Sequence, residues 1–202
     1  MAYTKLLTAA ALCALLSACA TVPPAPLSAQ PVAAFREQID FSGRLSVNYQ
    51  RDGKDDSLSG HFNWRQSAAG TDVALSSPLG QTVATISVTP QQATLTESGK
   101  PPRVAADIDT LSAQALGWPL PVSGLRQWLQ GYADGADGRR FVASPLNDNV
   151  TTKDGWHLTY VSWQDPAAGR PPQPKRIDAV RPAVQGAAAV DIRIVLDAGA
   201  AL

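Results

Sequence analysis

The residue type and spacing that most clearly predict covalent chemistry are those of the cysteine that ends Leu16-Ser17-Ala18-Cys19. It follows a positive charge at Lys5 and an apolar run from Leu6 to Leu16. A charged start, an apolar stretch and small residues before a cleavage point form a secretory signal. Ending that pattern on cysteine indicates a bacterial lipobox, in which the thiol takes a diacylglycerol, the chain is cut before it, and the new amino group is acylated. The alternative is an ordinary signal peptide that happens to contain a cysteine.

This interpretation divides the chain into three parts. We expect a signal peptide at residues 1–18, cleaved before Cys19, a lipidated Pro- and Ala-rich tether at 19–34, and a single domain at 35–202. The prolines predict a semi-rigid, extended tether. Apolar residues at helical spacing predict a short amphipathic helix from Pro31 to Ile39. Ala20 is not acidic, which among Gram-negative lipoproteins favours the outer membrane, with the domain on its periplasmic face.

Few other residues are placed for chemistry. The remaining cysteine, Cys13, lies in the signal, so the exported domain has neither a disulfide nor a thiolate metal site. The two histidines, His61 and His157, each sit inside a strand pattern without a second ligand at metal spacing. The loop Asp134–Gly138 lacks the ligand series and closing glutamate of a calcium loop. We therefore expect no metal, no cofactor other than acyl chains on Cys19, and no catalytic residue, although a hydrolase built from carboxylates alone stays open.

Composition narrows the class of partner. The chain carries 17 basic and 17 acidic residues, a net charge of zero, and has no basic stripe. Proteins that bind nucleic acid rely on clustered positive charge, so we do not expect this chain to bind nucleic acid.

The elements that would position these residues are mainly strands. Apolar and polar residues alternate with period two, which indicates half-buried antiparallel strands. Strands are expected around Phe41–Tyr49, Leu58–Arg65, Val73–Leu75, Ala84–Val88, Ala93–Leu95, Arg140–Ser144, Trp156–Trp163, Arg176–Val180 and Val190–Leu196. Four prolines exclude the loop Gln164–Pro174 from strand interiors. Two helices are expected between the groups of strands, at Ile108–Gly117 and Val122–Gly131. The predicted fold class is α+β, mainly β, a curved antiparallel sheet with helices on one side.

One turn breaks the rule that loops are polar. Pro78 and Gly80 punctuate a turn between two strands, and Leu79 lies between them. Leu79 either projects into solvent or folds back onto the sheet, and these residues alone favour the second reading.

Taken together, these stretches resemble the LolB family of outer-membrane lipoprotein receptors. The resemblance rests on five segments that follow one another in family order behind the lipobox. They are Phe41-Ser-Gly-Arg-Leu-Ser-Val47, Phe62-Asn-Trp-Arg-Gln66, Leu75-Ser-Ser-Pro-Leu-Gly-Gln81, Leu120-Pro121 and Leu125-Arg-Gln-Trp-Leu-Gln-Gly131.

The resemblance implies a half-open antiparallel β-barrel with a helical lid over an apolar cavity. It implies a monomeric, non-enzymatic receptor that accepts lipoproteins from the periplasmic carrier LolA and inserts their acyl chains into the outer membrane. It also implies that Pro78, Leu79 and Gly80 form a loop that serves membrane delivery. The candidates to line the cavity are Phe41, Leu45, Val47, Leu58, Phe62, Trp64, Ile86, Val88, Leu125, Trp128 and Leu129. A scaffold lipoprotein of an envelope assembly complex is the alternative function.

Overall fold

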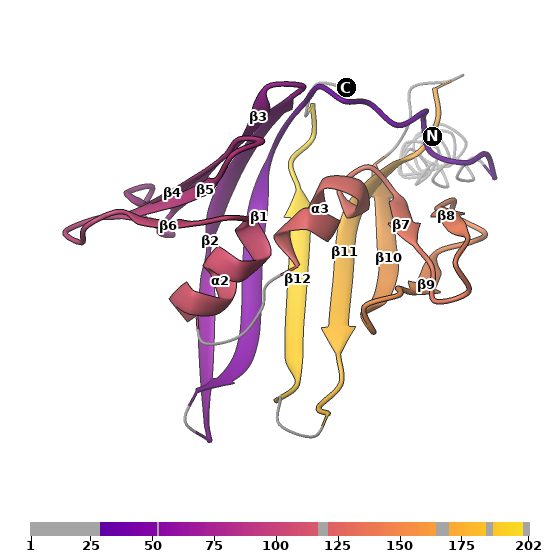
Figure 1. Cartoon of the computed structure of the whole chain (residues 1–202). Coiled ribbons are helices and arrows are strands. Elements are labelled where there is room, and N and C mark those ends of the chain that lie inside the picture. The colour runs from indigo at the N-terminus through magenta and orange to yellow at the C-terminus, as the bar shows by residue number, and fades with distance from the viewer. Residues whose placement is uncertain (1–28, 52, 117–120, 165–169, 185–187, 200–202) are drawn as a thin grey trace, which may run out of the picture.

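A computed structural model describes residues 29–51, 53–116, 121–164, 170–184 and 188–199. About half of them belong to a ten-stranded antiparallel sheet in the order β6-β5-β4-β3-β2-β1-β12-β11-β10-β9 (Figure 1). Its strands are β1 (Ile39–Arg51), β2 (Lys54–Ser67), β3 (Gly70–Ser76), β4 (Thr82–Val88), β5 (Ala93–Glu97), β6 (Arg103–Ala105), β9 (Asn149–Thr151), β10 (His157–Gln164), β11 (Gln173–Arg181) and β12 (Val190–Leu196). A separate pair consists of β7 (Tyr132–Asp134) and β8 (Arg140–Val142).

Alternation along the strands decides which side chains enter the core. In β12 the residues Val190, Ile192 and Ile194 are buried, whereas Asp191 and Arg193 between them are exposed. Successive side chains of a strand point to opposite faces, so this pattern buries one face of the sheet and leaves the other in water. The predicted mainly β, α+β class is confirmed.

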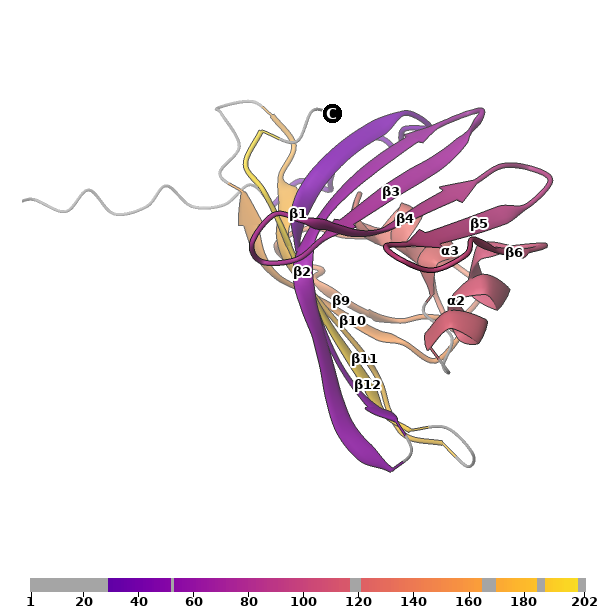
Figure 2. The same cartoon turned by 90° about the vertical axis from the view of Figure 1, so that its left-hand side faces the viewer.

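The sheet is strongly curved but does not close. Its terminal strands, β6 and β9, are not paired with each other. Figure 2 shows the two halves of the sheet splayed apart, with both helices in the opening between them. The expected half-open barrel with a helical lid is therefore confirmed.

The lid consists of α2 (Ile108–Leu116) and α3 (Val122–Trp128). Asp107 caps the start of α2, because the Thr110 N–H and hydroxyl both donate to its carboxylate, each at 2.7 Å. Asp109 of α2 accepts hydrogen bonds from the Ser123 N–H at 3.2 Å and its hydroxyl at 2.5 Å, which ties the two helices together. In the described part of the chain, no helix is long and apolar enough to cross a membrane.

The N-terminal segment departs from the prediction. Residues 31–38 form no helix but run along the domain in an extended path. Tertiary hydrogen bonds replace helical ones: the Arg36 N–H donates to Gln130 Oε1 at 2.9 Å, and Gln130 Nε2 donates to the Arg36 carbonyl at 3.1 Å. Val32 is buried and its N–H donates to the Ala143 carbonyl, so the fold begins within the stretch expected to be tether. The signal, Cys19 and most of the tether lie outside the described residues.

Short strands were the other departure. Three strands of three residues, β6, β7 and β9, were not predicted, because so few residues cannot display a period. Excluding the whole of Gln164–Pro174 from strands was wrong at both ends, since Gln164 is the last residue of β10 and Gln173 the first of β11. Pro174 is the second residue of β11 and lies opposite Trp163, where the register shifts. Proline has no N–H to donate to a neighbouring strand, and it is tolerated here because it lies near the start of the strand, beside a shift of register.

Candidate functional site

The two halves of the barrel are filled differently. On the side of β10–β12 the interior holds large, fully buried side chains: Trp156, Tyr160 and Ile177 are each at most 1% exposed. Trp128 of α3 reaches into this region, with its ring 5.8 Å from that of Trp156. Aromatic and branched side chains therefore fill most of the interior of this half.

An apolar cavity lies under α3, against the other half of the sheet. Its volume, measured as the space open to the centre of a water molecule, is about 40 Å³. Every residue of its wall is apolar: Leu45, Phe62, Trp64, Val73, Leu75, Ile86, Val122, Leu125, Leu129 and Ile194. A site of this kind offers no hydrogen bond to a ligand and suits a hydrocarbon.

Local sequence explains how this wall is built. Val122, Leu125 and Leu129 recur at helical spacing along and just beyond α3, so they share the face turned to the sheet. Gly43 of β1 leaves room for Phe62: a Cβ there would lie 2.9 Å from the Phe62 ring and 2.4 Å from the Val195 carbonyl oxygen. A side chain at this glycine would therefore disturb both the cavity wall and the sheet.

The one polar group of the Trp64 side chain is satisfied. Its indole N–H donates to Gln66 Oε1 at 3.3 Å, and Gln66 Nε2 in turn donates to the Glu37 carbonyl at 3.2 Å. Burial of an indole N–H without a partner would cost free energy. The N-terminal segment thus supports the cavity wall through Gln66.

Six of the eleven candidates line this cavity: Leu45, Phe62, Trp64, Ile86, Leu125 and Leu129. Val73, Leu75, Val122 and Ile194 also line it but were not among the candidates, although they lie at inward positions of elements that the sequence predicted. Alternation identified the inward face but could not say which inward residues border empty space.

The other five candidates lie elsewhere. Val47 and Trp128 are buried in the core, and Val88 packs against it. Leu58 is a correction, since it is 40% exposed. β2 extends past the end of β3, whose last residue, Ser76, pairs with His61. At Leu58 the neighbouring strand is therefore absent on that side.

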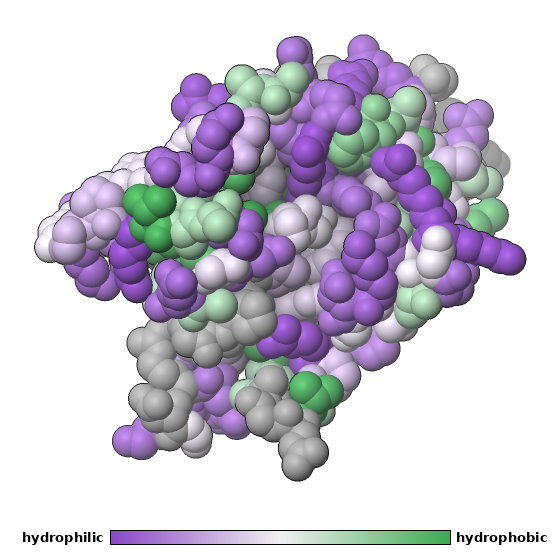
Figure 3. Space-filling model, in the orientation of Figure 1, coloured by the Kyte–Doolittle hydropathy of each residue, from purple (hydrophilic) through white to green (hydrophobic). Residues whose placement is uncertain are grey.

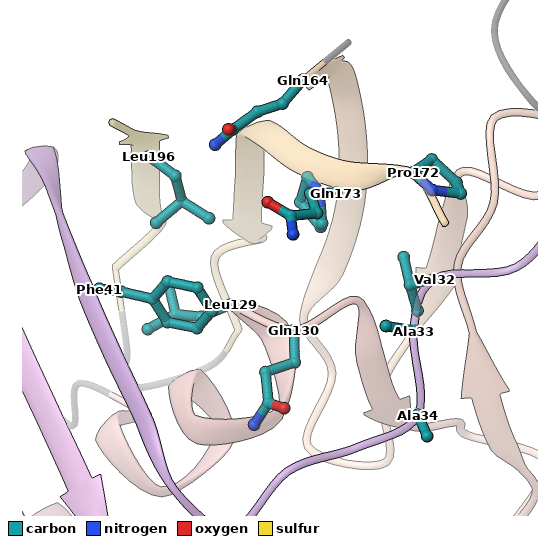
Figure 4. Close-up of a pocket in the computed structure, with 11 residues that line it drawn as sticks. Val32, Ala33, Ala34, Phe41, Leu129, Gln130, Gln164, Pro172, Gln173 and Leu196 are labelled. Atoms are coloured by element: carbon teal, nitrogen blue, oxygen red, sulfur yellow. The ribbon is translucent and has the colours of Figure 1, made fainter. Parts of the chain in front are cut away.

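Phe41 lines a second, smaller hollow of about 20 Å³. In Figure 4, Phe41 and Leu129 lie together on one side of this hollow, and Val32, Ala33 and Ala34 lie on another. The hollow is closed by the N-terminal segment, which is held there by the Tyr132 hydroxyl donating to the Ala33 carbonyl at 2.7 Å.

The turn at Leu79 projects from the sheet. The Gly80 N–H donates to the Ser77 carbonyl at 2.8 Å, and Gly80 has a φ of +84°, which favours glycine. Leu79 is 90% exposed and makes no core contact, so of the two readings of this turn the structure shows the projecting one. Apolar side chains also gather on the β4–β6 part of the surface in Figure 3, where Val83 and Val104 are exposed.

Polar candidates do not assemble into a reactive centre. His61 lies exposed on the outer face of β2, and the His157 ring lies 2.9 Å from the Thr151 hydroxyl. Asp134 forms an ion pair with Lys153 at 3.5 Å. Within the described ranges, no group of three His, Cys, Asp or Glu residues is arranged to hold a metal ion.

Comparison with known proteins points in one direction. The family model described as outer membrane lipoprotein LolB matches residues 37–198. The chain is 41% identical over 184 residues to an outer-membrane lipoprotein LolB of Cupriavidus necator, covering 91% of this chain and 90% of that protein. It is 36% identical over 197 residues to that of Thiobacillus denitrificans, covering 96% of each chain.

Solved structures are more distant. A LolA superfamily protein from Nitrosomonas europaea has a TM-score of 0.40 and 8% identity, with 80% of this chain and 86% of that one covered. A DUF1329 family protein from Desulfovibrio piger has a TM-score of 0.44 and 9% identity, with 80% and 85% covered.

Proposed function

This chain belongs to the LolB family of outer-membrane lipoproteins, and we propose that it is the receptor that accepts lipoproteins from the periplasmic carrier LolA and inserts their acyl chains into the outer membrane. In this proposal it is a lipid-anchored monomer with no catalytic step and no cofactor beyond the acyl chains on Cys19. The observation that carries the proposal is the cavity under α3, whose wall is apolar throughout.

The cavity is too small for its cargo in the conformation described. A volume of about 40 Å³ is about a quarter of the roughly 150 Å³ of an apolar cavity that binds one benzene molecule. An acyl chain is a string of many methylene groups, each roughly the size of a water molecule. Cargo must therefore displace the lid.

The helices differ in how firmly they are held. The C-terminal end of α3 is fixed, because the Tyr160 hydroxyl donates to the Trp128 carbonyl at 3.2 Å and Arg126 pairs with Glu37. For α2, the polar links to α3 are those from Asp109 to Ser123. We infer that α2 moves together with the start of α3, which lines the cavity through Val122, and that the C-terminal end of α3 is the hinge.

Delivery needs contact with lipid as well as a cavity. Leu79 is 90% exposed, and burying a leucine side chain is worth roughly 1.5–3 kcal/mol. That is enough to favour contact with the bilayer without holding the loop there. Transfer can then run downhill without a nucleotide, if acyl chains are more stable in the receptor than in the carrier and more stable still in the membrane.

A fluorescent fatty-acyl probe tests the cavity directly. The protein is the mature chain from residue 19 with Cys19→Ala, which keeps every described residue but cannot be acylated. We expect the probe to bind and an acylated lipoprotein to displace it. Ile86→Trp places a large ring in the cavity, so it should weaken probe binding at least tenfold.

The matched control is Val83→Trp. Val83 lies on the same strand as Ile86 but on its outward face and is 42% exposed. Thermal unfolding of both variants shows whether each is folded. Equal probe binding by the wild type and a folded Ile86→Trp variant would contradict the proposed cavity, and stable co-purification with protein partners without acyl ligand would favour a scaffold instead.

A further inference from the structure

A second open space, on the outer face of the sheet, lies beside the Leu79 loop. Its volume, measured in the same way as that of the cavity, is about 390 Å³, and Pro78 forms part of its wall. Two arginines, Arg44 and Arg193, and the ring of His61 border it, and none of its lining residues is acidic. We call this space the basic cleft.

Strand register brings these side chains together. Arg44 of β1 lies directly opposite His61 of β2, and Ser46, two residues further on the same face, lies opposite Arg193 of β12. Cross-strand neighbours on one face have their Cβ atoms about 5 Å apart. The cleft is therefore built from three adjacent strands of the most regular part of the sheet.

The positive charge in the cleft is only partly neutralised. Among the described residues, no carboxylate forms an ion pair with Arg44. Arg193 Nε lies 3.4 Å from Asp178 Oδ1, but that carboxylate is already held by Arg176 at 2.5 and 2.9 Å. The Arg193 side chain stays 55% exposed. Two guanidinium groups thus face solvent beside an apolar loop.

We propose that the basic cleft binds the phosphate group of an anionic membrane lipid when the Leu79 loop touches the bilayer. Arg44 and Arg193 supply the charge, and the His61 ring supplies an N–H donor in either protonation state. The cleft would hold the receptor at the headgroup level while Leu79 reaches the acyl region. This inference rests on the proposed role of the Leu79 loop in delivery.

The position of the basic cleft beside the Leu79 turn favours a membrane lipid over a soluble anion as its ligand. Pro78 belongs both to the wall of the cleft and to the turn that exposes Leu79, so one surface can contact the cleft and the turn together. Another large open cleft contrasts with it: beside the β1–β2 and β11–β12 strand ends, it is bordered by Asp55, Asp56 and Asp191. Of these two clefts, the one that lies beside the apolar turn is the positively charged one.

Vesicle flotation with the mature Cys19→Ala chain tests the inference. Vesicles of phosphatidylcholine alone are compared with vesicles that also contain phosphatidylglycerol. We expect the wild type to prefer the anionic vesicles and the double variant R44Q/R193Q to bind them on the order of tenfold more weakly at low salt, with unchanged binding to phosphatidylcholine. Arg65→Gln is the control, because Arg65 is on β2, four residues from His61 and outside the cleft.

Each outcome decides something. Equal binding of the wild type and R44Q/R193Q to anionic vesicles would overturn the inference, as would an equal loss with Arg65→Gln. Inorganic phosphate, added at constant ionic strength, should not release the protein, and release would show a soluble-anion site instead. Leu79→Asp separates the two proposals: it should weaken binding to both kinds of vesicle, and if it does not, the delivery role of Leu79 fails while the lipid preference of the arginines can still hold.

Discussion

Replacing Leu79 by aspartate should separate the two halves of the transfer reaction. Leu79 is 90% exposed and contacts no core residue, so the free energy of unfolding should change by no more than about 0.5 kcal/mol. The cavity lies under α3 and does not include Leu79. The variant should therefore take lipoprotein from the carrier at the wild-type rate.

Delivery should be impaired strongly. Loss of leucine burial removes roughly 1.5–3 kcal/mol of contact with lipid, which corresponds to about a 10- to 150-fold weaker encounter with vesicles. Aspartate adds the cost of bringing a charge to the bilayer, so the upper part of that range is expected. The assay is a reconstituted transfer of an acylated lipoprotein from carrier to receptor and then to liposomes, with each step measured separately.

The chain contains a matched control. Leu146 is 82% exposed, at the tip of another Ser-Pro-Leu turn in which Ser144 and Asn147 exchange two backbone hydrogen bonds at 3.0 Å. Leu146→Asp makes the same chemical change at a turn outside the proposed delivery loop. Normal delivery by Leu79→Asp, or an equal defect in Leu146→Asp, would refute the assignment of delivery to this loop.

Three further predictions concern the fold that carries the site. Tyr160→Phe should lower the free energy of unfolding by about 0.5–1.5 kcal/mol in denaturant titrations, because it removes one of the two hydrogen bonds to the Trp128 carbonyl, which keeps the Gly131 N–H as a donor. Burial also raises the pKa of the Tyr160 hydroxyl, so the folded protein should keep this phenol protonated and lose stability as the pH rises above about 10. Gly43→Ala should destabilise the domain by about 1–3 kcal/mol and weaken probe binding, since its Cβ would lie 2.4 Å from the Val195 carbonyl oxygen and 2.9 Å from the Phe62 ring. An unchanged free energy of unfolding would contradict the close approach of Val195 and Phe62 to Gly43. The Thr110 N–H lowers the pKa of the Asp107 carboxyl, so the stabilisation from this carboxylate is present above about pH 4 and lost as the pH falls further. Asp107→Asn keeps a cap without a titrating group, so its melting temperature should fall less than that of the wild type between pH 5 and pH 3. Identical dependence of the melting temperature on pH would exclude Asp107 as the cause.

Local sequence was sufficient for much of the fold. Long strands such as β1, β2 and β12 were predicted because alternation over seven or more residues leaves one choice of buried face. Both lid helices were predicted for a similar reason, since an apolar stripe at helical spacing and stop signals depend only on neighbours along the chain. The turn at Pro78-Leu79-Gly80 followed from the conformational preferences of proline and glycine.

Prediction from sequence failed where a distant segment decides the outcome. Residues 31–38 have a helical pattern but pair with Gln130, which is 94 residues away from Arg36. Leu58 has the inward phase of its strand but lies past the end of β3, so its side chain stays exposed.

What the amino-acid sequence determined by itself is the order of the longer strands and of the two helices, and the face of each that is apolar; the export signal and the lipobox stay predictions. Only the tertiary structure decided that the apolar face on the β10–β12 side is filled by Trp128 and Trp156, whereas the face at Phe62 and Trp64 borders a cavity. Likewise, only the register placed Arg44, His61 and Arg193 in one cleft. The physical reason is that alternation and helical periodicity record which way a side chain points, while the distance to whatever lies opposite depends on how the whole sheet curves.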